Sequence, residues 1–556
     1  MNRDLHVAQG AVQEAVRENP GLLEKICGDH QARNQSGLQP AVSIESELHC
    51  AIRDIMLDKQ VPSFDKRRHV SVLVRTELER LGEFCRTQDG RLFFFQKSER
   101  RLHDLEQKHF QHLLTQFSGL SVTEVGFRFV LDILQSHTAI KAPVVEVHTL
   151  AHYNAETGLL ALSDGGGGVW FRERGGRWEF THNGANGLLF LTEPEATAWV
   201  PEFTRSDESL RWFLSRTMLA SEPLSRGEQE TLFYLNLLHQ FFPPLRRTRM
   251  IPAFLGPQGS GKTTALRLTG CLFLGPAFDV TGLQRDREDA FVAAVTNRTV
   301  CGLDNADSRI PWLEDALAAF ATGLRYQLRR LYTTNEEVSY IPRAILMISS
   351  RDPQFNRPDV AERLLPLYFE RPERYQAEGE IFCELESRRG SIWGALMSDL
   401  ADIADGLEKI AAPPLRFRMA DFAAFGWRAY AGRGGQGKDW ERLLAHLERA
   451  QAGFASEGDG IIETLRAVLL KKGSVGPIKV ADLYKDCSAI AEDQGLSFPR
   501  TANGFGRKLT TLRRVIELEL GASVREERDR DKFRWITMTR RFADGADAAE
   551  GISEKV

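Results

Sequence analysis

The fold is decided by residues 250–270, MIPAFLGPQGSGKTTALRLTG. The stretch begins as an apolar run of strand character and ends with the spacing of a helix, so the glycines between them form a strand-to-helix loop. The pattern G-x-x-x-x-G-K-[ST] is complete, with its defined positions taken by Gly256, Gly261, Lys262 and Thr263. Glycines in such a loop let backbone N–H groups turn toward a phosphate, and the helix that follows adds the positive end of its dipole. A chance glycine-rich turn is the alternative, but it does not explain why strand, loop, Lys-Thr and helix agree.

We expect this loop to bind the phosphates of ATP. The Lys262 ammonium supplies positive charge for the β- and γ-phosphates, and the Thr263 hydroxyl is suited to Mg²⁺. ATP and Mg²⁺ are therefore the expected cofactors. The expected nucleotide-binding residues follow one another along the loop: Gly256, Pro257, Gln258, Gly259, Ser260, Gly261, Lys262, Thr263 and Thr264.

A second metal ligand is expected from RTVCGLDNADS, residues 298–308. The apolar run before Asp304 predicts a buried strand, which places this carboxylate at the C-terminal edge of the sheet, where a nucleotide lies. We predict that Asp304 holds Mg²⁺ together with Thr263. Many motor ATPases have a Glu directly after this Asp, but here the residue is Asn305, so either Asn305 orients the attacking water, or Asp307 takes part, or hydrolysis is slow. A surface turn is the alternative for this segment.

The next apolar strand, residues 344–348, ends in Ser349 and Ser350. In a parallel sheet its C-terminal end also faces the nucleotide, so a polar side chain there can contact the γ-phosphate or the attacking water. We predict this role for Ser349 or Ser350. The alternative is that either serine only caps the loop.

An arginine for a shared site is expected from DVAERLL, residues 359–365. Arg363 follows an acidic cluster and precedes an apolar strand, and in that place it can complete the ATP site of a neighbouring subunit as an arginine finger. The alternative is an ordinary ion pair with Asp359 or Glu362. Weaker candidates for the finger are Arg343, Arg351 and Arg357.

Length and pattern divide the chain into several domains. Its 556 residues, 42% of them hydrophobic and 27% charged, suit a globular protein of about three domains. Helical spacing dominates to about Ile140, and short alternating runs separated by glycine turns follow to Thr192, with Gly165–Gly168 expected as a hairpin turn. The predicted division is an N-terminal helix and linker (1–44), an α+β collar or accessory domain (45–249), the ATPase core (250–372), a helical region (373–460), a winged-helix domain (461–541) and a disordered tail (542–556).

The basic charge is concentrated near the end of the chain. Residues 461–541 contain 17 Lys and Arg against 11 Asp and Glu, a net charge of +6, which leaves −10 for the rest of a chain whose total is −4. Three helices and a hairpin in this order suit a winged helix that binds DNA. The residues expected to contact DNA are Arg507, Lys508, Arg513, Arg514, Arg528, Arg530 and Lys532. A solvated charged face is the alternative.

Cysteine usage and hydropathy indicate a reducing compartment. The seven cysteines are scattered and form no C-x-x-C pair, so neither a disulfide framework nor a cysteine zinc ribbon is expected. The N-terminus has no apolar segment of signal-peptide type. The longest uncharged apolar stretch, Thr231–Leu245, is too short and interrupted to span a bilayer. We predict a cytoplasmic protein without a membrane partner.

The succession GPQGSGKT, LDNAD, ISSR and DVAERLL resembles the AAA+ ATPase core of superfamily 3 helicases, in the phage, plasmid and poxvirus primase-helicase group. The resemblance implies an α/β P-loop AAA+ core with a mainly parallel sheet, an N-terminal α+β domain and a C-terminal winged helix. It further implies a ring, expected to be a hexamer, that acts on single-stranded or forked DNA. The specific motifs lie in residues 250–372, and Ser349-Ser350 depart from the Asn that the family usually has. No primase domain is recognisable, so a separate primase is among the expected replication partners.

The resemblance also implies a hairpin that points into the channel of the ring. The matching segment is Tyr326–Tyr340, with Arg325, Arg329 and Arg330 at its base or on its first strand. A ring of such arginines lines a pore with charge that follows a phosphate backbone. The alternative is that they are solvated or paired within the subunit.

Two classes of function therefore compete. The first is an ATP-dependent DNA helicase or translocase in the replication of a phage, plasmid or other mobile element. The second is an ATP-gated DNA-binding or assembly scaffold, for example in a defence system, which does not unwind DNA. A small-molecule kinase is disfavoured, because residues 45–240 and the basic end would then have no role.

Overall fold

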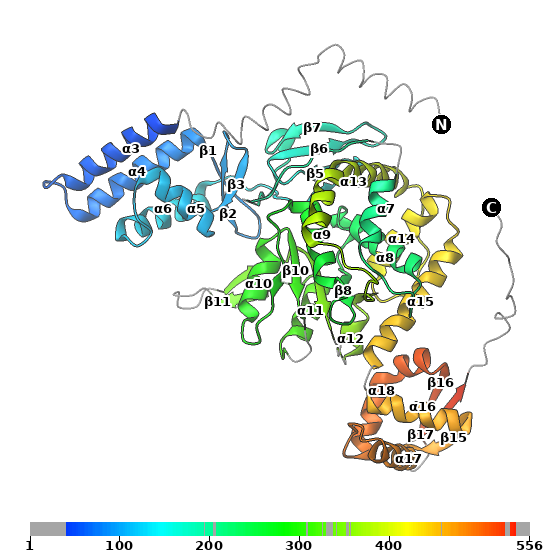
Figure 1. Ribbon diagram of the computed structural model, residues 1–556. Coiled ribbons are helices and arrows are strands. Elements are labelled where there is room, and N and C mark those ends of the chain that lie inside the picture. The colour runs from blue at the N-terminus through cyan, green and yellow to red at the C-terminus, as the bar shows by residue number, and fades with distance from the viewer. Residues whose placement is uncertain are drawn as a thin grey trace, which may run out of the picture. The chain divides into compact units, whose positions relative to one another are not determined.

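The chain divides into two compact units between Val145 and Glu146, and each is described by itself. The computed structural model (Figure 1) describes residues 41–193, 195–203, 207–306, 310–324, 326–329, 337–340, 342–351, 355, 357–456, 459–528 and 534–540. The predicted tail and nearly all of the predicted N-terminal helix and linker lie outside these residues. The division falls within the accessory domain predicted over 45–249, since strands that follow it share a core with residues 250–372.

The first unit packs helices around a small antiparallel sheet. The helical character predicted up to about Ile140 is confirmed, and residues 82–104 add three antiparallel strands in the order β1-β2-β3. Large apolar side chains such as Phe94, Phe110 and Phe127 fill its core. Its elements are α3 (Ala41–Leu57), α4 (Ser63–Leu81), β1 (Gly82–Arg86), β2 (Leu92–Gln96), β3 (Arg101–Asp104), α5 (Lys108–Ser118) and α6 (Val125–Lys141).

The second unit begins with a four-stranded antiparallel sheet in the order β4-β5-β6-β7. Gly165–Gly168 lies at the turn between β5 and β6, as predicted, and the Asp164 carboxylate accepts hydrogen bonds of 2.8 Å from the N–H groups of Gly166 and Gly168. The elements are β4 (Ala151–Tyr153), β5 (Leu160–Ser163), β6 (Gly168–Arg172), β7 (Glu179–His182) and η1 (Ala185–Gly187).

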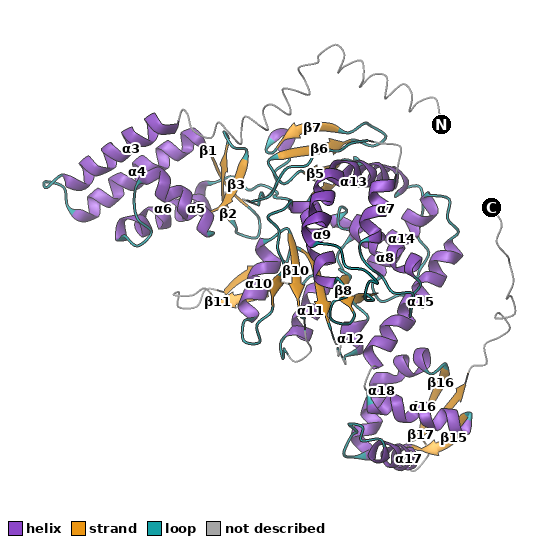
Figure 2. Cartoon of the chain, viewed as in Figure 1, coloured by secondary structure: helices purple, strands orange, loops and turns teal. Residues whose placement is uncertain are grey.

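A five-stranded parallel sheet forms the centre of the second unit, in the order β14-β8-β13-β10-β9. Strands β8 and β13 are buried along their whole length, as strands covered on both faces are, and helices flank the sheet (Figure 2). The α/β pattern predicted for residues 250–372 is confirmed. Its elements are β8 (Ile251–Leu255), α9 (Lys262–Leu274), β9 (Thr281–Gly282), α10 (Glu288–Asn297), β10 (Val300–Asp304), α11 (Leu313–Ala321), β11 (Tyr326–Arg329), β12 (Glu337–Tyr340), β13 (Ile345–Ser350), α12 (Pro358–Ala361) and β14 (Leu364–Tyr368).

Further helices before and after this sheet complete its core. Residues 208–239 contain two helices, and the residues between them pair with the end of β14. Leu219 bridges Phe369, and the Ala220 N–H donates to the Tyr368 carbonyl at 2.7 Å. The elements are α7 (Glu208–Ser215), α8 (Arg226–His239), η2 (Pro243–Leu245), α13 (Glu378–Gly406), α14 (Ala420–Gly432) and α15 (Gly437–Ser456).

The end of the chain contains the three predicted helices and the predicted hairpin. It also contains β15, an edge strand that the sequence analysis missed, since Gly476 and Pro477 weaken the strand pattern and the pairing is irregular between Val475 and Ile478. The elements are α16 (Gly460–Lys472), β15 (Ser474–Lys479), α17 (Val480–Asp493), α18 (Ala502–Glu519), β16 (Ala522–Arg528) and β17 (Arg534–Arg540).

Two expectations about composition are met within the described residues. The six cysteines that are described there are all free thiols. No described helix combines the length and the apolar character needed to cross a bilayer.

Trp393 is a central packing residue of the second unit. It is fully buried, stacks on Trp199 with ring centroids 3.7 Å apart, and donates from Nε1 to the Leu272 carbonyl at 3.0 Å. We predict that Trp393→Ala lowers the free energy of unfolding by about 3–5 kcal/mol, because it leaves a large cavity in the core and removes one of the two side-chain hydrogen bonds to the Leu272 carbonyl. Denaturant unfolding measures the change. Leu470→Ala, at a side chain that is 67% exposed, is the control and should cost less than about 0.5 kcal/mol. Equal effects would contradict the prediction.

Candidate functional site

The loop between β8 and α9 has a backbone that requires glycine. Gly256, Gly259 and Gly261 have φ values of 150°, 80° and 81°, which lie in the region that side chains avoid. A Cβ atom at Gly256 would lie 2.3 Å from the carbonyl oxygen of Phe369, so this glycine is also needed for close packing. Gly261 is the N-cap of α9. The chain therefore turns from the sheet edge directly into the helix.

Lys262, the first residue of α9, points back into the loop. Its Nζ donates to the carbonyl oxygens of Gly256 and Pro257, each at 2.7 Å. Burial is the main cause that lowers the pKa of Lys262, and the positive charge of Arg351 lowers it further, while the Asp304 carboxylate raises it. The ammonium is thus enclosed by carbonyl oxygens near the end of β13.

Thr263 and Asp304 are brought together as predicted, although they lie 41 positions apart in the chain. The Thr263 hydroxyl donates to the two carboxylate oxygens of Asp304 at 3.2 and 3.3 Å. They meet because β10, which ends at Asp304, and the loop after β8 open on the same edge of the parallel sheet. A hydroxyl and a carboxylate are oxygen ligands of the kind that Mg²⁺ prefers.

Ser349 completes this cluster. It is buried on β13, which lies between β8 and β10, and its hydroxyl donates a hydrogen bond to the Asp304 carboxylate. The Asn305 N–H donates to the Ser349 hydroxyl at 3.3 Å. Ser350 is buried as well and pairs in register with Leu255, the last residue of β8. Of the two predicted serines, Ser349 is therefore the one whose hydroxyl contacts the predicted metal ligand.

Asn305 stands where the sequence analysis noted a departure from motor ATPases. Its φ of 57° is left-handed, a conformation that Asn tolerates better than most residues. Its side-chain amide donates to Asp304 at 3.5 Å, which places the amide beside the predicted metal ligand. Asp307, the other residue proposed to help position water, lies outside the described residues.

Residues that the sequence analysis missed also surround the loop. The Arg371 guanidinium donates to the Gln258 carbonyl at 2.8 Å. Tyr375 approaches Gly259, and Met218, whose φ is 40°, approaches Gly261. No pattern marks these residues, because they come from the connections before α8 and after β14. Only the pairing of those connections at the sheet edge brings them to the loop.

The loop residues Ser260 and Thr264 have different surroundings. Ser260 is fully buried, and its hydroxyl lies 3.3 Å from the Lys262 ammonium. The Thr264 hydroxyl faces outward to Glu378, to which it donates at 3.1 Å. Glu378 also pairs with Arg267, so the first turn of α9 is tied to the start of α13.

Arg363 lies at the amino-terminal edge of the parallel sheet, whereas the glycine loop after β8 lies at the carboxyl-terminal edge. It directly precedes β14, and its carbonyl accepts from the N–H of Ile251, the first residue of β8. Its guanidinium is largely buried and pairs with the Asp359 carboxylate at 3.1 Å. The ion pair that the sequence left open as the alternative is thus present in this subunit. Arg357, which is more exposed, shares the same carboxylate at 3.0 Å.

The basic residues of α18 fall into two groups. Arg507 and Lys508 are exposed in its first half and have no ion-pair partner among the described residues. Arg513 pairs with Glu517 at 3.2 Å, and Arg514 pairs with Glu448 of α15 at 3.0 Å. Both also lie on exposed positions, but their charge is partly compensated within the chain.

The remaining predicted DNA contacts are described only in part. Arg528 is exposed at the end of β16. Strands β11 and β12 pair antiparallel with Tyr326 opposite Tyr340 and Arg329 opposite Glu337, so the predicted hairpin before β13 is present in the backbone. Arg325, Arg330, Arg530 and Lys532 lie outside the described residues, and Arg329 is described by its place in β11 alone.

The fold and the site together define an α/β protein with a parallel sheet and a complete G-x-x-x-x-G-K-T loop at its carboxyl edge. Residues 228–439 match the protein family described as "Actinomycete integrative conjugative element replication protein". This match spans the loop, the Asp304 strand and the helices α8, α13 and α14.

The chain is also similar to solved structures, at low sequence identity. "The A form apo structure of NrS-1 C terminal region-CTR" is 10% identical, with a TM-score of 0.37, and the similarity covers 84% of this chain and 98% of that one. "Structure of Drosophila ORC bound to DNA" is 15% identical, with a TM-score of 0.15, over 62% of this chain and 93% of that one. No curated protein matches the sequence.

Gly256→Ala tests the backbone of the loop. We predict a loss of more than about 1 kcal/mol in the stability of the second unit, because the added methyl group meets the Phe369 carbonyl and the φ of 150° disfavours a side chain. Thermal unfolding measures the loss. Gly282→Ala, on β9 of the same sheet, is the matched control, since a Cβ there meets nothing within 4 Å. If Gly256→Ala and Gly282→Ala lower the stability by equal amounts, the described geometry of the loop is wrong.

Proposed function

We propose that this protein is a Mg²⁺-dependent ATPase whose site is the loop after β8. The observation that carries the proposal is the contact of the Thr263 hydroxyl with the Asp304 carboxylate, beside the enclosed ammonium of Lys262. Two oxygen ligands for the metal ion and a lysine at the N-terminus of α9 supply the contacts that a nucleoside triphosphate with bound Mg²⁺ requires. Thr263 and Asp304 would hold Mg²⁺, which neutralises phosphate charge when bound.

Hydrolysis at this site would rely on positioning. Ser349 holds the Asp304 carboxylate by a hydrogen bond, and Asn305 lies next to it with an amide that can orient a water molecule. An amide does not accept a proton at neutral pH, so Asn305 cannot act as a general base. We therefore expect slow hydrolysis unless a neighbouring subunit or DNA completes the site.

We further propose an AAA+ ring that moves DNA during replication of an integrative conjugative element. The family match over residues 228–439 supports a replication role. The hairpin of β11 and β12 directly before β13 supports the resemblance to superfamily 3 helicases, where such a hairpin grips DNA. A hexamer would set six of these hairpins around one strand. The arrangement of α16–α18 with β15–β17 supports a winged helix as the DNA-binding end.

The place of Arg363 supports a role between subunits. At the opposite sheet edge it does not reach its own loop, so it can serve only the site of a neighbour. The Asp359 carboxylate holds Arg363 and Arg357 together in one cluster. A neighbour's phosphates would have to compete with that carboxylate, and at Arg357 also with Asp315, with which Arg357 forms a second ion pair. We propose this pair of arginines as the source of the finger.

An ATP-gated DNA-binding scaffold is the second candidate function. Asn305 favours it, because an ATPase that has an amide and not a carboxylate directly after Asp304 can hold ATP for long periods. In such a protein, binding of ATP drives assembly, and hydrolysis only resets it. The two candidates share the nucleotide site and differ in whether DNA strands are separated.

Lys262→Ala tests the nucleotide site. We predict that it lowers the rate of ATP hydrolysis at least about 100-fold, because the charge on the phosphates is lost. Lys438→Ala, at an exposed lysine of α15, is the matched control and should keep the wild-type rate. Hydrolysis is measured with and without single-stranded DNA in Mg²⁺. An unchanged rate in Lys262→Ala would refute the site.

Displacement of a labelled strand from forked duplexes separates the two functions. The helicase proposal requires displacement that depends on ATP and is lost in Lys262→Ala. If the protein assembles and hydrolyses ATP on DNA yet displaces no strand on any fork, the scaffold is the correct function.

Arg507 and Lys508 are expected to carry DNA binding by α18. We predict that the double variant Arg507→Ala/Lys508→Ala weakens binding and lowers the slope of log affinity against log salt by about one per residue, since each releases a phosphate contact. Arg513→Ala on the same helix is the control, because its charge is paired with Glu517. Fluorescence anisotropy with a short duplex measures both. An equal loss in the control would contradict this division of the helix.

A further inference from the structure

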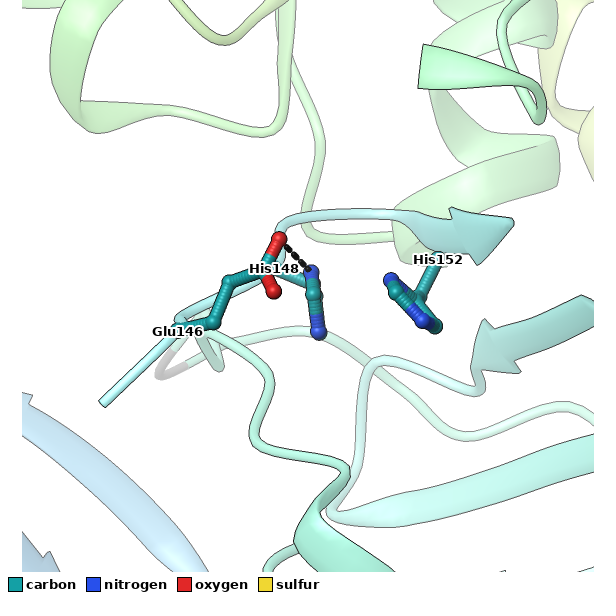
Figure 3. Close-up of side chains that lie close together, drawn as sticks. All are labelled: Glu146, His148 and His152. Atoms are coloured by element: carbon teal, nitrogen blue, oxygen red, sulfur yellow. Dashed lines mark ion pairs between the residues drawn. The ribbon is translucent and has the colours of Figure 1, made fainter. Parts of the chain in front are cut away.

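The side chains of Glu146, His148 and His152 converge at the start of the second unit (Figure 3). Each offers one ligand atom, and the three atoms lie within 4.8 Å of one another. His148 Nδ1 is 3.8 Å from a carboxylate oxygen of Glu146. The two imidazoles lie side by side, with centroids 4.1 Å apart and planes at 37°.

A reversal of the chain brings the two histidines together. Four residues of extended strand would separate them by about 13 Å. Instead, the chain bends at Thr149 and Leu150 before β4 begins. On one side of the bend, the backbone of His148 pairs with residues 189–191, with hydrogen bonds of 2.9 and 2.8 Å. On the other side, His152 is paired in β4 opposite Ala161. Because both imidazoles come from backbone that is paired on each side, their approach is built into the fold.

Burial affects both imidazoles. Burial lowers the pKa of His148 to about 3, and the neighbouring His152 and Arg343 add to this effect. Burial also lowers the pKa of His152, against an opposing effect of Glu146. The exposed carboxylate of Glu146 supplies the negative charge of the cluster.

The three residues line a cavity of about 240 Å³. Arg246, Arg249 and Arg343 line it as well, so its walls carry more positive than negative charge. Arg246 is buried, and its Nε has no hydrogen-bond partner within the described part of the chain. A bare dication is disfavoured among these guanidinium groups. A metal ion that also carries an anionic ligand would be accepted, because the arginines then face that ligand.

We propose that Glu146, His148 and His152 bind a divalent transition-metal ion, best Zn²⁺, whose fourth ligand is an anion held in the arginine-lined cavity. Two imidazoles and one carboxylate suit Zn²⁺, which takes four ligands and leaves one position to water or another group in open sites. A tetrahedral site brings its ligand atoms to roughly 3.3 Å from one another. The exposed side chain of Glu146 can rotate to close the present spacing of up to 4.8 Å.

Zn²⁺ binding to the full chain tests the proposal. The protein is stripped of metal and titrated with Zn²⁺ against a chromogenic chelator, with Mg²⁺ in excess and without ATP. We expect the wild-type protein to bind one Zn²⁺ per chain. In His152→Asn and in Glu146→Gln we expect this binding to be lost or its affinity to fall more than about tenfold. His112→Asn, at an exposed histidine of α5, is the matched control and should bind as the wild type does. His148 is packed against Phe190, so its replacement is not needed for the test.

Cobalt spectra distinguish the proposed site from metal binding by cysteine thiols. Co²⁺ in the proposed site gives d–d bands of a tetrahedral centre without thiolate charge-transfer bands, and His152→Asn removes them while circular dichroism stays unchanged. The proposal is overturned if His152→Asn and Glu146→Gln bind like the wild type, or if the only spectrum is that of cysteine-bound cobalt. Inorganic phosphate at millimolar concentration tests the anionic ligand: tighter Zn²⁺ binding supports it, and unchanged binding rejects that part.

Discussion

The position of the Asp304 carboxylate is the constraint on which the rest of the candidate site depends. It accepts hydrogen bonds from Thr263 on α9 and from Ser349 on β13, so three elements meet at one group. This meeting requires β13 to lie between β8 and β10, which is the observed strand order. The glycines of the loop also help to bring Thr263 to Asp304. The closeness of Gly256 to Phe369 lets α9 start directly after the sheet edge.

Among the described residues, the main core of the second unit runs from Leu150 to Met538, and a smaller cluster around Phe190 lies in the antiparallel sheet. The parallel sheet is therefore connected through packed side chains to residues 460–540, which contain the basic helix α18. Arg514 of α18 pairs with Glu448 of α15, and Gln451 of α15 donates to the Leu364 carbonyl of β14 at 2.7 Å. These contacts join β14 through α15 to α18, the helix on which Arg507 and Lys508 are exposed. This coupling suits either proposed function, since both require the nucleotide to influence DNA binding.

The two candidate cation sites of this unit differ in chemistry. Thr263 and Asp304 offer oxygen ligands at the mouth of a phosphate-type loop and suit Mg²⁺. Glu146, His148 and His152 offer two nitrogen ligands and one carboxylate, next to a cavity with three arginines. Because the ligand sets differ, we expect the two sites to favour different metal ions. The histidine site can be studied without nucleotide, and the loop without Zn²⁺.

The sequence by itself determined the parallel core, the glycine loop, the approach of Thr263 to Asp304 and the basic helix, because runs of apolar residues and local motifs encode burial and turns directly. Tertiary structure alone decided which serine contacts Asp304, that Arg363 lies far from its own loop, that Arg371 reaches Gln258, and where the first unit ends. It also brought His148 to His152 by a bend that no periodicity marks. The physical reason is that local patterns specify which face of an element is buried, whereas strand order and chain reversals specify which side chains meet.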